Sequence, residues 1–385
     1  MKILVISNYY PPHFVGGYEL ACLNTVNYLK NAGHEVTVLT GNFIQESINF
    51  ESIYRKLKYI NYDNPSFWDK HKVEVYNYAL TKKLIKDLNP DLVYFWSLRL
   101  VSMAPAIAAE ELKVNKVFEI GDFWMKGYFN NSILSKIKRA IKTFLPFTIG
   151  SKVDFSPAIC VSKWIEEEMK EKYLSTLTYV IPNGVTVSQR KNKTLQEPVK
   201  YLFCGRLDYS KGVDLALKAL SNLKDKGVEN FIFHIYGEGD NKYLHKCRKI
   251  VQVLNLDKEV TFFGKKQNIH KTYDKYDILL MPTRMREPFG LVIIEAMAAG
   301  VVVIAPNEYG PSEIISHNND GLLFKRESIT DLTNNILKIH QNLHLYHKLR
   351  DKAFYTVFNK FNLLSVKKKV ESVLLNTLNR KNHGQ

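Results

Sequence analysis

The stretch Tyr201-Leu-Phe-Cys-Gly-Arg-Leu-Asp-Tyr-Ser-Lys-Gly-Val-Asp-Leu-Ala-Leu-Lys-Ala-Leu-Ser-Asn-Leu223 decides the fold of this chain. Its apolar beginning predicts a buried strand, which runs into a turn at Gly205. Apolar residues then recur at helical spacing over Val213–Leu223. A strand, a glycine turn and a helix in succession are typical of a parallel α/β sheet.

Strands and helices alternate in this way along the whole chain and fall into two sets. The first set of predicted strands comprises residues 2–8, 35–41, 91–96, 114–120, 157–161 and 178–181. The second comprises residues 199–205, 230–236, 259–263, 277–281, 301–305 and 321–324. This alternation favours doubly wound parallel sheets, which bind ligands at the carboxyl ends of their strands. We therefore expect a ligand site in a cleft between two such domains.

A length of 385 residues suffices for two domains that each have their own core. Linker residues are concentrated at Pro182-Asn-Gly184 and in the polar stretch 188–198. We therefore predict an N-terminal domain at residues 1–190 and a C-terminal domain at residues 199–361.

The net charge of +16 is spread over both halves and accompanies no nucleic-acid-binding motif, so we expect no nucleic acid partner. Four scattered cysteines, Cys22, Cys160, Cys204 and Cys247, indicate a reducing compartment rather than a disulfide framework or a zinc site. Residues 1–8 resemble a first strand more than a signal peptide, and no apolar run is long enough to span a bilayer. We therefore expect a cytoplasmic protein.

One basic segment, residues 132–146, has apolar residues on one helical face and four cations off it. Such a helix can rest on an anionic membrane surface, which would make the protein peripheral to the inner face of the membrane. The alternative is a helix that packs on its own sheet and exposes a solvated basic face.

Two carboxylates lie eight positions apart in Glu287-Pro-Phe-Gly-Leu-Val-Ile-Ile-Glu295, where a predicted helix begins that Gly300 ends. Three backbone N–H groups would lie at the N-terminus of this helix, where anions bind: those of Phe289, Gly290 and Leu291. An anion site between two carboxylates suits a ligand that is part phosphate and part polyol, such as a nucleotide sugar. The alternative is a core-facing helix with two solvated glutamates.

Cations and glycines follow other predicted strands. Arg206 and Lys211 precede the helix at 213–223, where they would meet a diphosphate, although each is also explained as a surface cation. Gly237 ends another strand, and the pair Gly16 and Gly17 lies in a loop after the first strand. Paired glycines permit close approach of a ligand to the backbone, or merely form a tight turn.

Together these residues resemble the glycosyltransferase family 4 pattern of the GT-B fold, in which two Rossmann-like domains face each other across a cleft. The resemblance covers almost the whole chain in matching order and is densest from 200 to 325. The motifs that carry it are Gly-Gly-x-Glu at 16–19, Gly-Arg-Leu…Lys-Gly at 205–212, Gly-x-Gly at 237–239, Glu-x7-Glu at 287–295, Asn-Glu-Tyr-Gly-Pro-Ser-Glu at 307–313 and Asp-Gly-Leu-Leu-Phe at 320–324.

The resemblance implies a role for each matching residue. Glu295 would bind the ribose hydroxyls and Glu287 the hydroxyls of the donor sugar, while Arg206 and Lys211 would hold the diphosphate. The backbones of Gly16 and Gly17 would face the diphosphate, and those of Gly205 and Gly237 would line the donor site. The base would meet the turn at Gly264. The last helix, at about 362–380, would return to the N-terminal domain, which binds the acceptor.

The sequence departs from the family in one place. Members of the family often carry a histidine, which faces the reacting sugar, just before the aspartate that matches Asp122. This chain has Gly121 at that position. Asp122 is the nearest ionisable group and a candidate for part of that role, with a turn-forming or capping aspartate as the alternative.

No metal or other cofactor is expected, since the chain has no Asp-x-Asp element and cations can neutralise the diphosphate. His340, His344 and His347 are spaced to share one helical face, which is a weak indication of a metal site.

The resemblance implies a retaining glycosyltransferase that moves a sugar from a nucleotide diphosphate sugar to a glycan or lipid-linked acceptor, in cell-surface polysaccharide or glycolipid synthesis. Two alternatives stay open at this point. One is another GT-B enzyme, such as a nucleotide-sugar epimerase, and the other is a non-catalytic nucleotide-sugar-binding partner.

Overall fold

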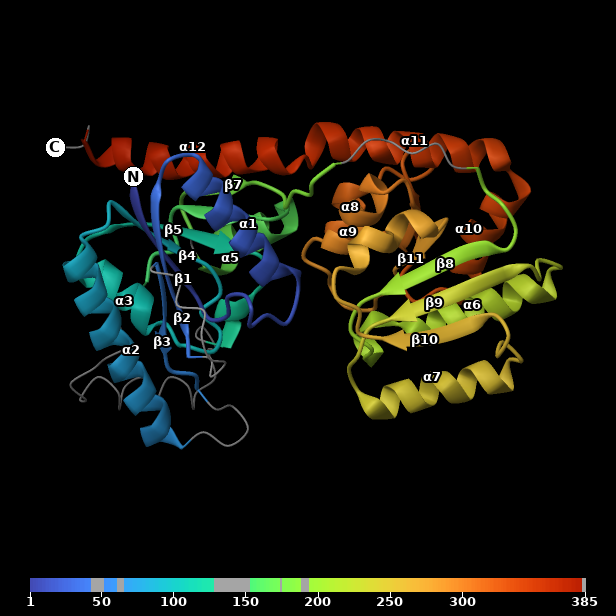
Figure 1. The fold of residues 1–385 in the computed structure, drawn as a ribbon, viewed down its shortest axis with the longest axis horizontal. Helices are drawn as coiled ribbons and strands as arrows, with labels where there is room; N and C mark the ends of the chain where they lie inside the picture. Colours follow the sequence, from blue (N-terminus) through green and yellow to red (C-terminus); the bar gives the residue numbers. More distant parts are fainter. Residues whose placement is uncertain (43–51, 61–65, 128–152, 174, 188–193, 383–385) are drawn as a thin grey trace. The chain divides into compact units, whose positions relative to one another are not determined.

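The computed structural model describes residues 1–42, 52–60, 66–127, 153–173, 175–187 and 194–382. The chain forms two compact units (Figure 1). The first comprises Met1–Pro182 and Lys367–Gln385, and the second comprises Asn183–Val366. The predicted segment 132–146 lies outside the described residues.

The first unit is built on a seven-stranded parallel sheet in the order β3-β2-β1-β4-β5-β6-β7. Its strands are β1 (Lys2–Ser7), β2 (Glu35–Gly41), β3 (Ile53–Leu57), β4 (Leu92–Phe95), β5 (Asn115–Ile120), β6 (Ala158–Cys160) and β7 (Thr178–Val180). Its described helices are α1 (Gly17–Asn31), α2 (Phe67–Leu88), α3 (Ala104–Glu111), α5 (Lys163–Tyr173) and most of α12 (Leu363–Asn382). This strand order is that of a doubly wound fold, as predicted.

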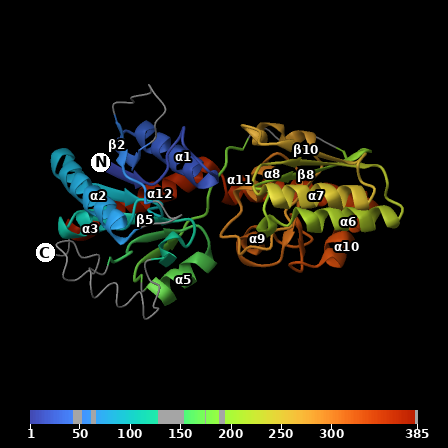
Figure 2. The ribbon, with the colours of Figure 1, turned by 90° about the horizontal axis from the view of Figure 1, so that it is seen from below.

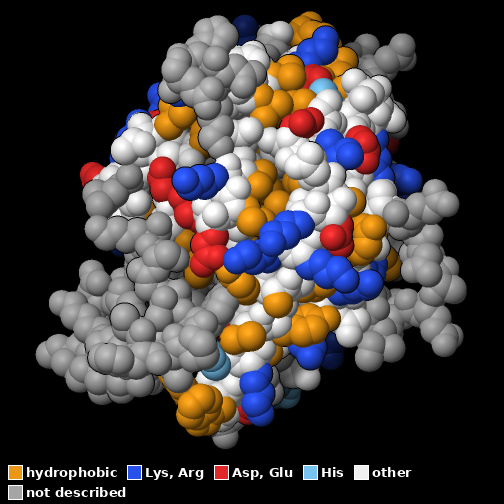
Figure 3. Space-filling model, turned by 90° about the vertical axis from the view of Figure 1, so that its left-hand side faces the viewer, with side chains coloured by type: hydrophobic (Ala, Val, Ile, Leu, Met, Phe, Trp, Pro, Cys, Tyr) orange, Lys and Arg blue, Asp and Glu red, His pale blue; other side chains and the backbone are white. Residues whose placement is uncertain are grey.

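Helices cover both faces of this sheet. Figure 2 shows α2 and α3 together on one side of it, and α1 with α12 on the other. Glu371 ties α12 to α1, because its carboxylate accepts hydrogen bonds from Tyr28 Oη at 2.6 Å and contacts His34 Nε2 at 2.8 Å. The outer side of α2 is open to solvent, and Figure 3 views the molecule from that side.

The second unit has a six-stranded parallel sheet in the order β10-β9-β8-β11-β12-β13. Its strands are β8 (Val199–Cys204), β9 (Phe231–Tyr236), β10 (Val260–Gly264), β11 (Ile278–Leu280), β12 (Val302–Pro306) and β13 (Leu322–Phe324). Its helices are α6 (Val213–Asp225), α7 (Asn241–Val253), α8 (Leu291–Ala298), α9 (Tyr309–Ile314), α10 (Ile329–Gln341) and α11 (Leu343–Lys360). Strands β8 and β11 are neighbours although they are not consecutive, so the strand order reverses between them.

The central strands of both units are buried on both faces, which explains why they were predictable as continuous apolar runs. Strand β3 was not predicted. It lies at the edge of its sheet, and Leu57 is its only buried residue, so its sequence lacks the signal of a core strand.

The division into units departs by a few residues from the predicted domain boundaries at 190 and 199. The chain joins the second unit from Asn183 onward. Val185 is the reason, because its N–H donates to the carbonyl of Phe361 at 2.9 Å and its own carbonyl accepts from the N–H of Leu363 at 2.9 Å. These bonds fix residues 183–187 to the second unit.

The prediction that three histidines share a helix is wrong. His340 lies in α10, whereas His344 and His347 lie in α11. Asn342 separates the helices: its backbone leaves helical geometry and its side chain accepts a hydrogen bond from Leu345 N at 2.9 Å. His340 contacts the hydroxyl of Tyr201 instead.

Of the helices in the described part of the chain, none combines the length and apolar character that crossing a bilayer requires.

Candidate functional site

The strand order of the second unit reverses between β8 and β11, and the loops that follow these two strands carry two of the predicted site residues. Lys211 Nζ lies 2.6 Å from Glu287 Oε2. Both side chains are largely withdrawn from water, with 17% and 16% of their surfaces exposed. The predicted phosphate-binding cation and sugar-binding carboxylate are therefore partners, at the place where doubly wound sheets bind ligands.

Three predicted glycines lie side by side at the carboxyl ends of β8, β9 and β10. Gly237 N donates to the carbonyl of Gly264 at 2.9 Å. A Cβ at Gly237 would lie 1.8 Å from the carbonyl oxygen of Gly205, and its φ of +145° also requires glycine. Bare backbone at this edge leaves room for a ligand to approach.

Two further predicted residues have different surroundings. Arg206 is exposed and lies 3.6 Å from Asp208 across a weak ion pair, so its guanidinium is available to a ligand. Glu295 is half-buried and accepts a hydrogen bond from Tyr273 Oη at 3.3 Å. Burial raises the pKa of Glu295 to about 7, and the bond from Tyr273 lowers it only in part. Tyr273 was not predicted as a site residue.

The helix that contains Glu295 begins later than predicted. Gly290 is the N-cap of α8, and Leu291 is its first residue. Phe289 precedes the helix and is buried, with its ring centroid 5.9 Å from that of Phe361. Gly290 has a φ of +108°, which breaks the helix at this position and corrects the prediction that Phe289 is a part of the helix N-terminus.

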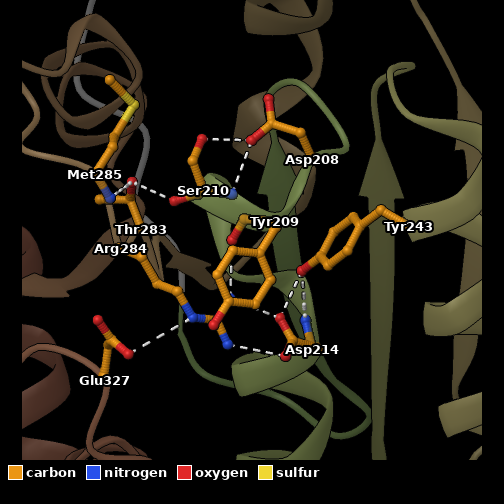
Figure 4. Close-up of polar contacts among 9 residues, drawn as sticks. All are labelled: Asp208, Tyr209, Ser210, Asp214, Tyr243, Thr283, Arg284, Met285 and Glu327. Atoms are coloured by element: carbon orange, nitrogen blue, oxygen red, sulfur yellow. Dashed lines mark hydrogen bonds and ion pairs between the residues drawn. The ribbon is translucent and has the colours of Figure 1, made fainter.

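A buried ion pair joins the loop after β11 to the first turn of α6 (Figure 4). Arg284 binds Asp214 through two hydrogen bonds of 2.8 Å, and Tyr243 Oη donates to Asp214 at 2.6 Å. Burial raises the pKa of Asp214, but the bonds from Arg284 and Tyr243 outweigh it and hold that pKa below its usual value. The Arg284 guanidinium also lies over the ring of Tyr209, 4.2 Å from its centroid.

Hydrogen bonds of the backbone reinforce the Arg284–Asp214 pair, and we call the pair and these bonds together the clamp. The carbonyl of Ser210 accepts from Arg284 N at 2.7 Å, from Met285 N at 3.2 Å and from Thr283 Oγ1 at 3.1 Å. Arg284 further donates to the carbonyl of Tyr209 at 2.9 Å. The residues next to Lys211 are thus fixed to the residues before Glu287, so the positions of both loops are set independently of the Lys211–Glu287 contact.

In the first unit, the predicted glycine pair lies at the start of α1. Gly16 is the N-cap and Gly17 the first helical residue. Glu19 is buried, and its carboxylate accepts hydrogen bonds from Gly16 N at 2.9 Å and Val15 N at 3.4 Å. No heavy atom lies within 4 Å of a Cβ built at Gly16, so this backbone is open to a ligand.

The structure explains the glycine at position 121. A Cβ there would lie 2.0 Å from the ring of Tyr18. The Tyr18 hydroxyl donates to the carbonyl of Glu119 at 2.7 Å, and its ring lies 5.1 Å from that of Trp96. Tyr18 therefore occupies the space into which a side chain at 121 would extend, a relation that the sequence does not reveal.

Asp122 lies just after strand β5, and Glu119 lies near the end of that strand. Asp122 forms an ion pair with Arg99 at 2.8 Å, and both side chains are about half exposed. Glu119 is buried and accepts a hydrogen bond from Tyr94 Oη. Burial raises the pKa of Glu119 to about 7, against the opposing effects of Lys367 and Tyr94. The ionisable group predicted for a catalytic role, Asp122, is thus held by a cation.

Among the described residues, no group of three or more histidine, cysteine, aspartate or glutamate side chains is arranged to hold a metal ion. Each of the four cysteines is a free thiol.

Comparison with known proteins identifies the family. A family model described as Glycosyltransferase Family 4 matches residues 15–189, and one described as Glycosyl transferases group 1 matches residues 186–355. An uncharacterized 42.6 kDa protein in the cps region of Klebsiella pneumoniae is 27% identical over 339 residues, covering 82% of this chain and 87% of that protein.

Solved structures agree on the fold. A glycosyltransferase of Rickettsia africae superposes with a TM-score of 0.73 at 21% identity, covering 98% of each chain. HepE of Anabaena, solved in complex with UDP and glucose, has a TM-score of 0.72 at 17% identity and covers 98% of this chain and 100% of its own. These likenesses confirm the predicted GT-B fold. The chain therefore belongs to the family 4 glycosyltransferases.

Proposed function

We propose that this glycosyltransferase moves a sugar from a nucleotide diphosphate sugar to a glycan or lipid-linked acceptor, with retention of configuration at the transferred carbon. The Lys211–Glu287 ion pair at the β8–β11 reversal supports the proposal, since a cation that can bind phosphate lies beside a carboxylate that can bind sugar hydroxyls. HepE, a structural relative, was solved with UDP and glucose, which are the two parts of such a donor.

We expect the donor to bind the second unit in a single orientation. The diphosphate binds Lys211 and the exposed Arg206, and the sugar hydroxyls bind Glu287. Glu295 accepts hydrogen bonds from the ribose, while the base meets the turn at Gly264. In the first unit, the backbone at Gly16 has no heavy atom within 4 Å of a built Cβ, which leaves it open to a phosphate group.

In this mechanism the barrier lies in departure of the diphosphate from a sugar with oxocarbenium character. Lys211 and Arg206 stabilise the negative charge that develops on the leaving diphosphate, which lowers the barrier to that step. The leaving phosphate takes the proton of the acceptor hydroxyl, so no separate base is needed. We therefore propose that the reaction requires no metal ion.

The acceptor belongs to cell-surface polysaccharide or glycolipid synthesis, in keeping with the relative in the cps region. We place the reaction in the cytoplasm, with which four free thiols are consistent, and at the inner face of the membrane when the acceptor is lipid-linked.

The test is a nucleotide-sugar panel, with donor hydrolysis and donor binding measured in the presence of a chelator. Parent protein should bind one donor and hydrolyse it slowly. Lys211→Ala should lose most turnover, and Glu287→Ala should bind the intact donor more weakly while keeping affinity for the free nucleotide. A matched control is Lys224→Ala, since Lys224 forms an ion pair of 2.6 Å with Glu259 in the same unit.

The outcomes separate the alternatives. Release of free sugar and nucleotide supports a transferase, an epimerised nucleotide sugar identifies an epimerase, and binding without turnover identifies a non-catalytic partner. Activity that vanishes in chelator and returns with magnesium or manganese would refute metal independence.

A further inference from the structure

Helix α2 of the first unit exposes a continuous stripe that its own fold leaves unused. The stripe consists of six exposed side chains at helical spacing: Trp68, Lys72, Val75, Ala79, Lys83 and Lys86. Trp68 is 59% exposed and Val75 37% exposed. Three apolar and three cationic side chains therefore share one exposed line of a helix of 22 residues. Figure 3 shows basic, acidic and hydrophobic side chains interspersed on this side of the molecule.

The edge strand β3 extends this surface. Lys56 and Lys58 are exposed, and Lys58 Nζ lies 4.1 Å from the centroid of the Tyr76 ring on α2. Tyr76 is itself 37% exposed. We call the α2 stripe together with Lys56, Lys58 and Tyr76 the α2 face.

Five lysines of the α2 face have no carboxylate partner among the residues that the structure describes. Glu74 also belongs to α2 but is buried, so the exposed acidic residues of the helix are Asp69 and Asp87, near its two ends, and Asp69 is bonded to Ser66. The middle of the face is therefore purely cationic and apolar.

From this pattern we propose that the α2 face docks on an anionic lipid bilayer. Five lysines match anionic headgroups, and Trp68 and Tyr76 are side chains that favour the membrane–water interface. Val75 and Ala79 favour a bilayer over a glycan or a nucleic acid, because aliphatic side chains form no hydrogen bonds to such polar ligands. They gain free energy by leaving water for the acyl boundary, as in helices that lie in the interface plane.

The topology of the sheet relates the α2 face to the acceptor. This step rests on the proposed function, in which the acceptor is lipid-linked. A strand of a parallel sheet leads into its helix at the carboxyl edge of the sheet. Trp68, at the start of α2, is therefore at the edge to which Gly16 and Asp122 belong. A bilayer on the α2 face presents its headgroups beside the predicted acceptor side of this unit.

Trp68 supplies a direct measurement. Trp96 and Trp124 are buried and Trp164 is only partly exposed, so Trp68 is the tryptophan best placed to report contact with lipid. The full chain is mixed with vesicles of neutral lipid, with or without an anionic lipid, and with vesicles that carry bromine on their acyl chains. Co-sedimentation gives binding, and quenching by bromine gives depth.

The α2 variant is Lys72→Gln, Lys83→Gln and Lys86→Gln together. A variant with Lys218, Lys242 and Lys249 changed to glutamine is its matched control, because it removes the same charge from exposed positions of α6 and α7. Trp68→Phe assigns the fluorescence.

The proposal expects anionic vesicles to bind the parent and the matched control alike, with quenching that Trp68→Phe abolishes. Each lysine contributes about fivefold to the affinity for an anionic surface, so the α2 variant should bind anionic vesicles on the order of a hundredfold more weakly. Attraction should also decline as salt rises. Equal binding by both triple variants, absence of quenching, or preference for an anionic glycan or nucleic acid over vesicles would overturn it. Donor hydrolysis needs no vesicle. If the parent protein hydrolyses no donor, that result refutes the proposed function and not the docking proposal.

Discussion

Removal of the Arg284 side chain should loosen the donor side of the enzyme. Only 10% of the Arg284 side chain and 4% of the Asp214 side chain are exposed, and two bonds of 2.8 Å join them. Arg284→Ala leaves a buried carboxylate without its cation, which costs about 3–5 kcal/mol. Tyr243 still donates to Asp214, so we expect the lower end, about 3 kcal/mol.

The assay is urea unfolding of Arg284→Ala, Asp214→Ala and the double variant, followed by donor hydrolysis at a temperature where each is folded. The double variant should lose less stability than the sum of the single variants, because the two residues form one interaction. Turnover should fall by about tenfold or more, since only the hydrogen bonds to the carbonyl of Ser210 then hold the loop that carries Lys211 to the loop that carries Glu287.

The comparison variant is again Lys224→Ala, whose ion pair with Glu259 is more exposed and should cost about 1 kcal/mol or less. Equal loss of stability in Arg284→Ala and Lys224→Ala, or additive effects at 214 and 284, would refute the reasoning about a buried pair. Unchanged turnover in folded Arg284→Ala would refute the claim that the clamp positions the two loops.

Three further predictions concern single positions. Gly121→Ala should cost about 1–3 kcal/mol by thermal unfolding, since its Cβ would lie 2.0 Å from the ring of Tyr18, and combination with Tyr18→Ala should remove that extra cost. Glu119 binds its proton more tightly when folded, with a pKa of about 7 against 4.5, so stability should fall by about 3 kcal/mol as pH rises from about 4.5 to 7. Glu119→Gln should lack that decline, and an identical pH profile would contradict it. Glu295→Ala should weaken nucleotide diphosphate binding by about 1.5–3 kcal/mol in calorimetry, whereas parent-like affinity would exclude a ribose contact.

The fold was predictable because the central strands satisfy a simple physical condition. A parallel strand buried on both faces must be apolar throughout, so β8 and its neighbours stand out in the sequence. Strand β3 lies at the edge of its sheet, so it need not be apolar throughout and does not stand out in the sequence. The separation of His340 from His344 was likewise invisible to periodicity, because it depends on Asn342 leaving helical geometry and capping the next helix.

The site was predictable only where a single short motif holds the chemistry. Lys211 and Glu287 come from motifs with a local meaning, and the structure brings them together. Arg284 and Asp214 are 70 positions apart and belong to no motif. Each looks like a surface charge until the fold buries both. Contacts of this kind follow from tertiary packing and not from spacing along the chain.

The Lys211–Glu287 ion pair sets an energetic condition on any ligand at the β8–β11 reversal. Both side chains are shielded from water, so separating them without new partners leaves two uncompensated charges. A phosphate alone would take Lys211 and leave Glu287 unpaired, and a sugar alone would do the reverse. A nucleotide diphosphate sugar supplies both partners at once. On the proposed function the pair thus favours the intact donor over either fragment, and it re-forms when transfer splits the donor, which weakens the hold on the released nucleotide.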